Sequence, residues 1–189
     1  MARGERVLSR PVSRQGARVS GGSPRVRIRR VRGADLGAVH AINEAAVPHV
    51  NSIALQRFHG FMSEAAYFRV AMLGDRLAGY LVAFAPGASY ESVNYRWFQE
   101  RYRDFIYIDR IAVSAGARRR GIAGSLYRDI FRFARPRTTL LTCEVNTRPV
   151  NAESLAFHHS FGFREVGTQE TDGGAKTVSL MAVTLGAPD

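Results

Sequence analysis

Residues 105–127 read FIYIDRIAVSAGARRRGIAGSLY and predict a strand, a glycine-containing turn and a helix in succession. Apolar residues dominate Phe105 to Val113, as in a buried strand, and Ile122, Leu126 and Ile130 then recur at helical spacing. A turn of this kind places free backbone N–H groups and the positive end of the helix dipole at the tip of the strand. We therefore expect a phosphate-binding site at this turn.

The spacing within the turn narrows the kind of phosphate. Gly116 and Gly121 are separated as in a Walker A loop, but Ile122 and Ala123 stand where that loop needs lysine and a hydroxyl residue. The dinucleotide fingerprint G-x-G-x-x-G is also absent. What remains is Arg118-x-x-Gly121-x-Ala123, whose small residues let a pyrophosphate approach the backbone closely.

Strand and helix patterns alternate along the rest of the chain. Gly74-Asp75 joins two alternating apolar runs, which is typical of a hairpin, and residues 87–104 form a long aromatic-rich segment that we expect to be a loop. Strands in runs with inserted helices indicate an α/β or α+β sheet covered on both faces. The other expected elements are strands over 26–31, 138–145, 163–170 and 176–185, and helices over 34–46 and 151–160.

The positive charge is concentrated at the N-terminus. Residues 1–32 hold ten arginines against one glutamate, a net charge of +9 out of the +11 of the whole chain, which leaves +2 for residues 33–189. Residues 1–24 have no periodic apolar face, so we expect a disordered basic tail, with a transit peptide as the alternative, ahead of a single domain over residues 25–185. The near-neutral remainder argues against a nucleic-acid-binding module and specific nucleic-acid partners.

Two further observations concern the cellular location of the protein. The sequence has no apolar run of 18 residues, so we expect no membrane span, and Cys143 is the single cysteine, so no intrachain disulfide can form. A reducing compartment suits such a chain, and we expect the protein to be cytoplasmic. Cys143 lies in an apolar run, where packing is the simpler interpretation than nucleophilic chemistry.

A second motif follows the predicted turn. Residues 151–163 read NAESLAFHHSFGF. Together with Arg118-x-x-Gly121-x-Ala123, this segment resembles the GCN5-related N-acetyltransferase (GNAT) superfamily, because Asn151, Ser154, Gly162 and Phe163 fall on the family's Asn-x-x-Ser/Ala…Tyr-x-x-x-Gly-Phe pattern. The resemblance covers roughly residues 26–183. It implies the GNAT fold, in which a central mixed, mostly antiparallel sheet contains two splayed parallel strands.

The resemblance also implies a function. GNAT enzymes bind acetyl-CoA between the splayed strands, here residues 105–113 and 138–145, and the acceptor amine attacks the thioester directly. The chain is then an N-acetyltransferase for a primary amine of a small molecule or peptide, without a metal; a non-catalytic acyl-CoA-binding domain is the alternative. The residues implied for CoA are Ile111, Ala112, Val113, Arg118, Arg119, Arg120, Gly121, Ile122, Ala123, Gly124, Asn151, Ser154 and Phe157.

The catalytic residues stay open at this point. In the family a tyrosine seven positions after the Asn often protonates the leaving thiolate, and His158 stands there in this sequence. Imidazolium is a competent acid near neutral pH, but His158 could instead pack beside the cofactor. Candidate bases are Asp109 and Glu144, with a water chain as the alternative; a bulge could change which strand residues face the cleft.

The acceptor wall is expected near the first helix and the aromatic segment. The family usually builds its substrate wall after the first helix, where this sequence has Asn43, Glu44, His49 and Asn51. In the expected loop, residues 95–98, with Tyr95 and Trp97 among them, could roof the site. The alternative for these aromatics is that they only pack the loop against the core. A homodimer is possible if residues 176–185 pair across two copies.

Overall fold

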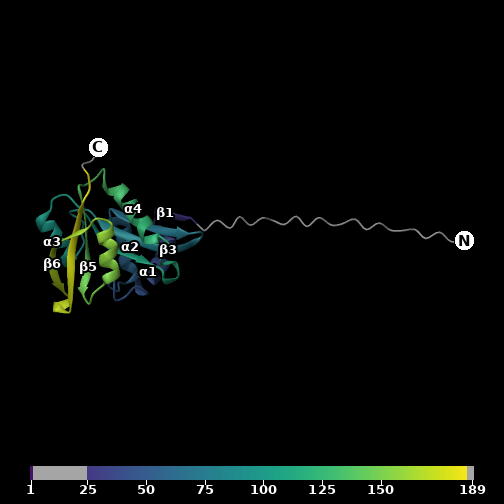
Figure 1. Cartoon of the computed structure of the whole chain (residues 1–189), viewed down its shortest axis with the longest axis horizontal. Helices are drawn as coiled ribbons and strands as arrows, with labels where there is room; N and C mark the ends of the chain where they lie inside the picture. Colours follow the sequence, from purple (N-terminus) through teal and green to yellow (C-terminus); the bar gives the residue numbers. More distant parts are fainter. Residues whose placement is uncertain (2–24, 187–189) are drawn as a thin grey trace.

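A seven-stranded sheet forms the centre of the protein in this computed structural model, which describes residue 1 and residues 25–186 (Figure 1). Residues 2–24, nearly all of the expected basic tail, lie outside the described residues. The strands are β1 (Val26–Arg30), β2 (Tyr67–Leu73), β3 (Arg76–Phe84), β4 (Ile106–Val113), β5 (Leu140–Arg148), β6 (Arg164–Thr171) and β7 (Lys176–Thr184).

The strand order is β1-β2-β3-β4-β5-β7-β6, so β1 and β6 are the two edges. Neighbours are antiparallel except for β4 and β5, which are parallel. Strands β6 and β7, in yellow, lie at the opposite end of the sheet from β1 (Figure 1). The expected mixed, mostly antiparallel sheet is therefore confirmed.

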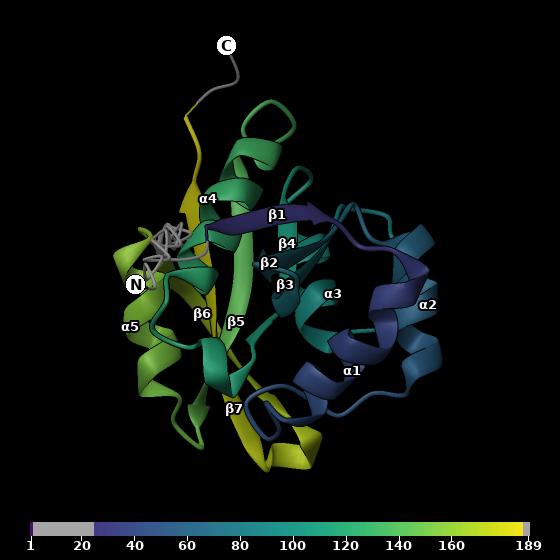
Figure 2. The ribbon, with the colours of Figure 1, turned by 90° about the vertical axis from the view of Figure 1, so that its right-hand side faces the viewer.

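Helices cover both faces of the sheet (Figure 2). Helices α1, α2 and α3 pack with the core around Ile42 and Phe58, and α4 packs with a second core around Leu126 and Ile130 on the other face. Within the described part of the chain, no helix is long and apolar enough to cross a membrane. The helices are α1 (Leu36–Glu44), α2 (Leu55–Glu64), α3 (Val93–Arg101), α4 (Ile122–Ala134) and α5 (Ala152–Ser160).

The aromatic segment contains a helix, so the expectation of a loop throughout residues 87–104 is wrong. Helix α3 buries Asn94, Tyr95 and Phe98 but exposes Val93, which leaves too short an apolar stripe for the helical period to stand out. The available signal is Ser92, whose hydroxyl accepts a hydrogen bond from the Tyr95 N–H and caps the helix. Helix α2, built on Phe58 and Phe61 at the same short spacing, was not predicted either.

Gly79 sets the distance between β3 and the end of β4. It pairs with Val113, and a Cβ at this position would come within 2.8 Å of the Ala112 carbonyl oxygen and 3.1 Å of the Ile122 side chain. The methyl group of an alanine at position 79 would therefore push β4 and α4 away from β3.

We expect Gly79→Ala to lower the free energy of unfolding by about 1–3 kcal/mol, because a backbone oxygen cannot move aside as a side chain can. Urea denaturation measures this change. Gly37→Ala is the matched control, since Gly37 lies in α1 with nothing within 4 Å of its added methyl, and it should stabilise by about 0.5 kcal/mol. Equal stability of the two variants would contradict the steric argument.

Candidate active site

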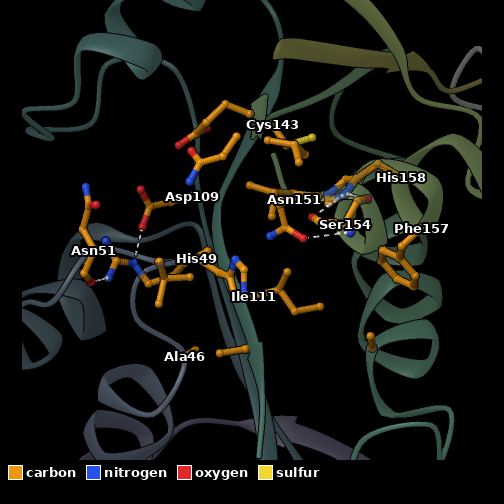
Figure 3. A pocket seen from close by; sticks show the side chains of 18 of the residues that line it. Ala46, His49, Asn51, Asp109, Ile111, Cys143, Asn151, Ser154, Phe157 and His158 are labelled. Atoms are coloured by element: carbon orange, nitrogen blue, oxygen red, sulfur yellow. Dashed lines mark hydrogen bonds and ion pairs between the residues drawn. The ribbon is translucent and has the colours of Figure 1, made fainter. Parts of the chain in front are cut away.

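Strands β4 and β5 diverge after a short stretch of pairing. Their last parallel pair is Ile108 with Cys143, although β4 continues to Val113 and β5 to Arg148. A cleft of about 840 Å³ opens between them and continues towards α1, α2 and the start of β7 (Figure 3). The expected splay of the two parallel strands is confirmed, and it creates the cleft.

One edge of β4 faces this cleft. On its other side β4 stays paired with β3 as far as Val113, and β5 has already separated, so the second edge of Ile111–Val113 is not used by the sheet. Ile111, Ala112 and Val113 all line the cleft. Their backbone groups can therefore pair with an extended ligand, as an added strand would.

The turn before α4 presents backbone donors at one end of the cleft. Gly121 has φ +75°, a left-handed conformation that favours glycine, and lies directly before the helix. The first intrahelical bond runs from the Ser125 N–H to the Gly121 carbonyl oxygen at 2.9 Å. The N–H groups of Ile122, Ala123 and Gly124 therefore precede the helical ladder and form an anion site with the helix dipole.

The three arginines of the turn are placed differently. Arg118, Arg119 and Arg120 are all exposed, but only Arg118 and Arg119 line the cleft. Two guanidinium groups thus add positive charge beside the backbone donors. Arg120 does not join the expected cofactor residues around the cleft.

Helix α5 forms the wall opposite β4. The Asn151 side chain accepts a hydrogen bond of 3.1 Å from the Ser154 N–H, so Asn151 is the N-cap of this helix. Asn151, Ser154 and Phe157 all line the cleft, as expected from the sequence (Figure 3). Asn151 of the second motif therefore also has a structural role as the cap of this helix.

His158 is held by hydrogen bonds on both ring nitrogens. Nδ1 lies 2.7 Å from the Ser154 carbonyl oxygen, which only accepts, so Nδ1 carries the proton. Nε2 then accepts from the Tyr127 hydroxyl at 2.5 Å. The side chain is 3% exposed, and its burial lowers the pKa of the imidazole, so the ring is neutral near pH 7. His158 reaches the cleft wall without a free proton to donate.

A bulge in β4 brings Asp109 and Arg110 to the same side. Val82 pairs with Arg110 but Ala83 pairs with Ile108, so Asp109 is the extra residue. Neighbours in a regular strand point to opposite faces, whereas here Arg110 Nε donates to Asp109 Oδ2 at 2.5 Å. The Tyr90 hydroxyl donates to Asp109 Oδ1, and all three residues line the cleft.

Glu144 lies on β5 in the same part of the cleft. Glu144 as a whole is partly exposed and lines the cleft. Its Oε2 atom, however, is buried and has no hydrogen-bond partner among the described residues. Burial, with repulsion from Asp109 as the second cause, raises the pKa of the Glu144 carboxyl to about 8. Such a carboxyl is mostly protonated near pH 7, and its ionised form can accept a proton, as a general base must.

The residues expected to bind the acceptor lie outside the cleft lining. Asn43 is buried, accepting from the Tyr80 hydroxyl at 2.6 Å and from Arg110 Nη1 at 3.2 Å, and Glu44 accepts from the Ser52 hydroxyl. Asn43 thus contacts the cleft-lining Arg110 without lining the cleft itself.

The two aromatics are also turned away. The Tyr95 hydroxyl donates to the Ala85 carbonyl oxygen at 2.6 Å, and Trp97 packs against Gly167, where a Cβ would come within 2.6 Å of its ring. The end of the cleft near α1 and α2 is lined instead by His49, Asn51, Arg57, Phe61, Tyr90 and Asn94. Of these, the sequence analysis named His49 and Asn51 and did not single out Arg57, Phe61 or Asn94. For Tyr90, the aromatic-rich segment was the available signal.

The chain matches a known protein family. The sequence model described as "Acetyltransferase (GNAT) family" matches residues 37–163. A comparison with the curated proteins found no match.

Solved structures with the same fold are numerous. The chain is similar to Ard1 from Thermoplasma volcanium, with a TM-score of 0.70 and 17% identity over 85% of this chain and 97% of that one. It is similar to the ribosomal-protein-alanine N-acetyltransferase from Brucella melitensis, with a TM-score of 0.66 and 24% identity over 84% and 99%. For Arabidopsis thaliana NAA60 with a bisubstrate analogue, the values are 0.69 and 17% over 86% and 99%.

The family match spans more than half of the sequence and includes the cleft between β4 and β5, the turn before α4 and helix α5. The chain therefore belongs to the acetyltransferase (GNAT) family.

Proposed function

We propose that the protein is an acetyl-CoA-dependent N-acetyltransferase that moves an acetyl group to a primary amine by direct attack within a ternary complex. The observation that carries the proposal is the arrangement of the cleft, which has an anion site at the turn before α4 and the high-pKa carboxyl of Glu144 further along. An enzyme of this type needs one end for the cofactor phosphates and the other for the acceptor proton.

The residues present fit coenzyme A. The N–H groups of Ile122–Gly124 suit its pyrophosphate, and the unused edge of Ile111–Val113 suits the extended pantetheine amides. When bound, acetyl-CoA supplies the activated acyl group. The same strand edge would place N–H donors beside the thioester oxygen, where negative charge develops.

Glu144 is the proposed general base. An amine at neutral pH is mostly protonated and must lose a proton before it attacks, and a base is most effective when its pKa is close to the working pH. Asp109 is less suited to this role because Arg110 and Tyr90 already occupy its carboxylate oxygens. His158 has no free proton to give, so the proposal lets the thiolate leave without its help.

The acceptor is a small-molecule amine or a peptide. Some similar structures are named as acetyltransferases of ribosomal-protein alanine, and one holds the bisubstrate analogue CoA-Ac-MVNAL. These names favour including peptide N-termini among the acceptors tested, alongside amino acids, polyamines and aminoglycosides.

Binding of the cofactor is expected to depend on Gly121. Acetyl-CoA and CoA should raise the melting temperature of the parent protein, and Gly121→Glu should abolish the rise, because a carboxylate there repels the pyrophosphate and a non-glycine residue resists φ +75°. Gly116→Glu is the control, since Gly116 lies earlier in the same segment and does not line the cleft. Absence of a shift in the parent would refute cofactor binding.

Glu144→Gln should lower kcat/KM about a hundredfold for whichever acceptor releases thiol in the screen. In the parent, kcat/KM should rise with pH through about 8 as Glu144 ionises. In the variant, the only rise of kcat/KM with pH should be the one caused by deprotonation of the acceptor amine.

The same ionisation gives a stability readout. The folded-state pKa lies above the ordinary value of 4.5, so stability from this group is present below pH 4.5 and is lost as pH rises towards 8. Melting temperatures of the parent should therefore fall more steeply over that range than those of Glu144→Gln. Parallel pH curves and unchanged turnover would reject Glu144 as the base.

His158→Phe should reduce stability more than catalysis. It leaves the buried Tyr127 hydroxyl without its acceptor, which costs about 1–3 kcal/mol of unfolding free energy, while kcat should fall less than tenfold. His159→Phe, on the exposed side of the same helix, is the matched control. A hundredfold loss of kcat in a variant of normal stability would instead assign His158 as the acid.

A further inference from the structure

Strand β4 and helix α3, both distant from β5 in the sequence, line the cleft together with Glu144. Ile108 pairs with Cys143, so Asp109 and Glu144 are the next residues along the two strands. Strand β4 contributes Tyr107 and, through its bulge, Asp109, while the first turn of α3 contributes Asn94. None of these contacts follows from the motifs of the cofactor site. The inference below concerns what they do to Glu144, and it rests on the proposed role of that residue as the base.

Asn94 is oriented by its other neighbour. Its Oδ1 accepts a hydrogen bond of 3.0 Å from Gln169 Nε2 on β6, so its NH2 group is the part left for Glu144. The side chain is almost fully buried and lines the cleft. A donor such as this NH2 group favours the charged form of a carboxyl, and the influence of Asn94 on Glu144 has that direction.

Tyr107 acts in the same direction. Its ring is fully buried among Tyr95 and Phe98, and its hydroxyl has no hydrogen-bond partner of good geometry within residues 25–186. Glu144 Oε2 is likewise buried without a partner, and the influence of the phenol on the Glu144 carboxyl favours the charged form. A buried donor and a buried acceptor without other partners gain most from closing on each other.

Asp109 acts in the opposite direction. Arg110 and the Tyr90 hydroxyl hold its two oxygens in place, and the side chains of Asp109 and Arg110 are only 5% and 7% exposed. A fixed negative charge beside Glu144 favours the protonated carboxyl. Because the bulge sets its position, Asp109 cannot turn away as a residue on a flexible loop could.

We propose that Asp109, Tyr107 and Asn94 are positioning residues for Glu144, with the Asp109 carboxylate opposing ionisation and the Tyr107 hydroxyl and Asn94 amide supporting it. Their balance keeps the Glu144 carboxyl mostly protonated in the free protein at neutral pH. The positive charge of an arriving ammonium favours loss of that proton to solvent, and the carboxylate so formed can then accept a proton from the amine. The reacting amine would thus meet a base whose strength is set by the protein and not by solvent.

The groups that face Glu144 come from each element around it. From β4 they are Tyr107, Asp109 and Arg110. The positive charge of Arg110 favours the charged form of the Glu144 carboxyl. Burial, with Glu144 as a smaller cause, raises the pKa values of Cys143 on β5, Tyr127 on α4 and Tyr90 beside α3. Cys143, Tyr127 and Tyr90 are neutral at the pH of interest, so Asp109 and Arg110 are the fixed charges of this set.

The test follows the carboxyl carbon of Glu144 by ¹³C NMR in the full chain without cofactor, with the resonance assigned by Glu144→Gln. We expect Asp109→Asn to move the titration midpoint down by about one pH unit, and Asn94→Ala and Tyr107→Phe to move it up by about half a unit each. Glu100→Gln, on the exposed side of α3 with a side chain 70% exposed, should leave it unchanged. Shifts of the midpoint in opposite directions would show specific effects on Glu144, because a general loss of structure would shift all variants in the same direction.

The outcomes separate this proposal from the proposed function. Unchanged midpoints in Asp109→Asn and Asn94→Ala would overturn the positioning role, and if Asp109→Asn fails to fold, Asn94→Ala decides alone. Once an acceptor is identified, the pH at which kcat/KM rises should shift in each variant by the same amount as the NMR titration midpoint. Midpoints that move while this pH stays the same would uphold the positioning residues and reject Glu144 as the base.

Discussion

The separation of β4 from β5 after Cys143 is the constraint on which the site depends. A parallel pair inside a sheet normally satisfies its backbone groups along its whole length, and here the pairing ends while β4 continues to Val113. The unused edge is available to a ligand because β3 still holds the other one. Helices α4 and α5 then complete the cleft, since each follows one of the two separating strands.

The parts of this arrangement that local sequence controls could be predicted. The strand, glycine turn and helix around Gly121 and the cap formed by Asn151 both depend on residues a few positions apart. The end of the cleft around Asp109 and Asn94 could not be predicted in the same way. Helix α3 has too short an apolar stripe, and the bulge at Asp109 has no residue pattern of its own, because it arises from the pairing of β4 with β3.

The bulge also explains why an ion pair is kept in an almost buried place. Burying Asp109 and Arg110 costs desolvation free energy that their attraction alone need not recover, so extra hydrogen bonds matter. Tyr90 bonds Asp109, and Asn43 accepts from Arg110. Asn43, expected at the substrate wall, thus supports the pair from behind, and an apolar pair of equal size would remove the charge that faces Glu144.

The proton balance of the proposed reaction is consistent with a neutral His158. If Glu144 takes the proton of the amine, that proton is held with a pKa of about 8, while a free thiol has a pKa of about 8.5. The two pKa values are similar, so passing the proton from this carboxyl to the released thiolate costs little free energy. A stronger acid at position 158 is not required thermodynamically, which leaves the imidazole free to pack against Tyr127 and Ser154.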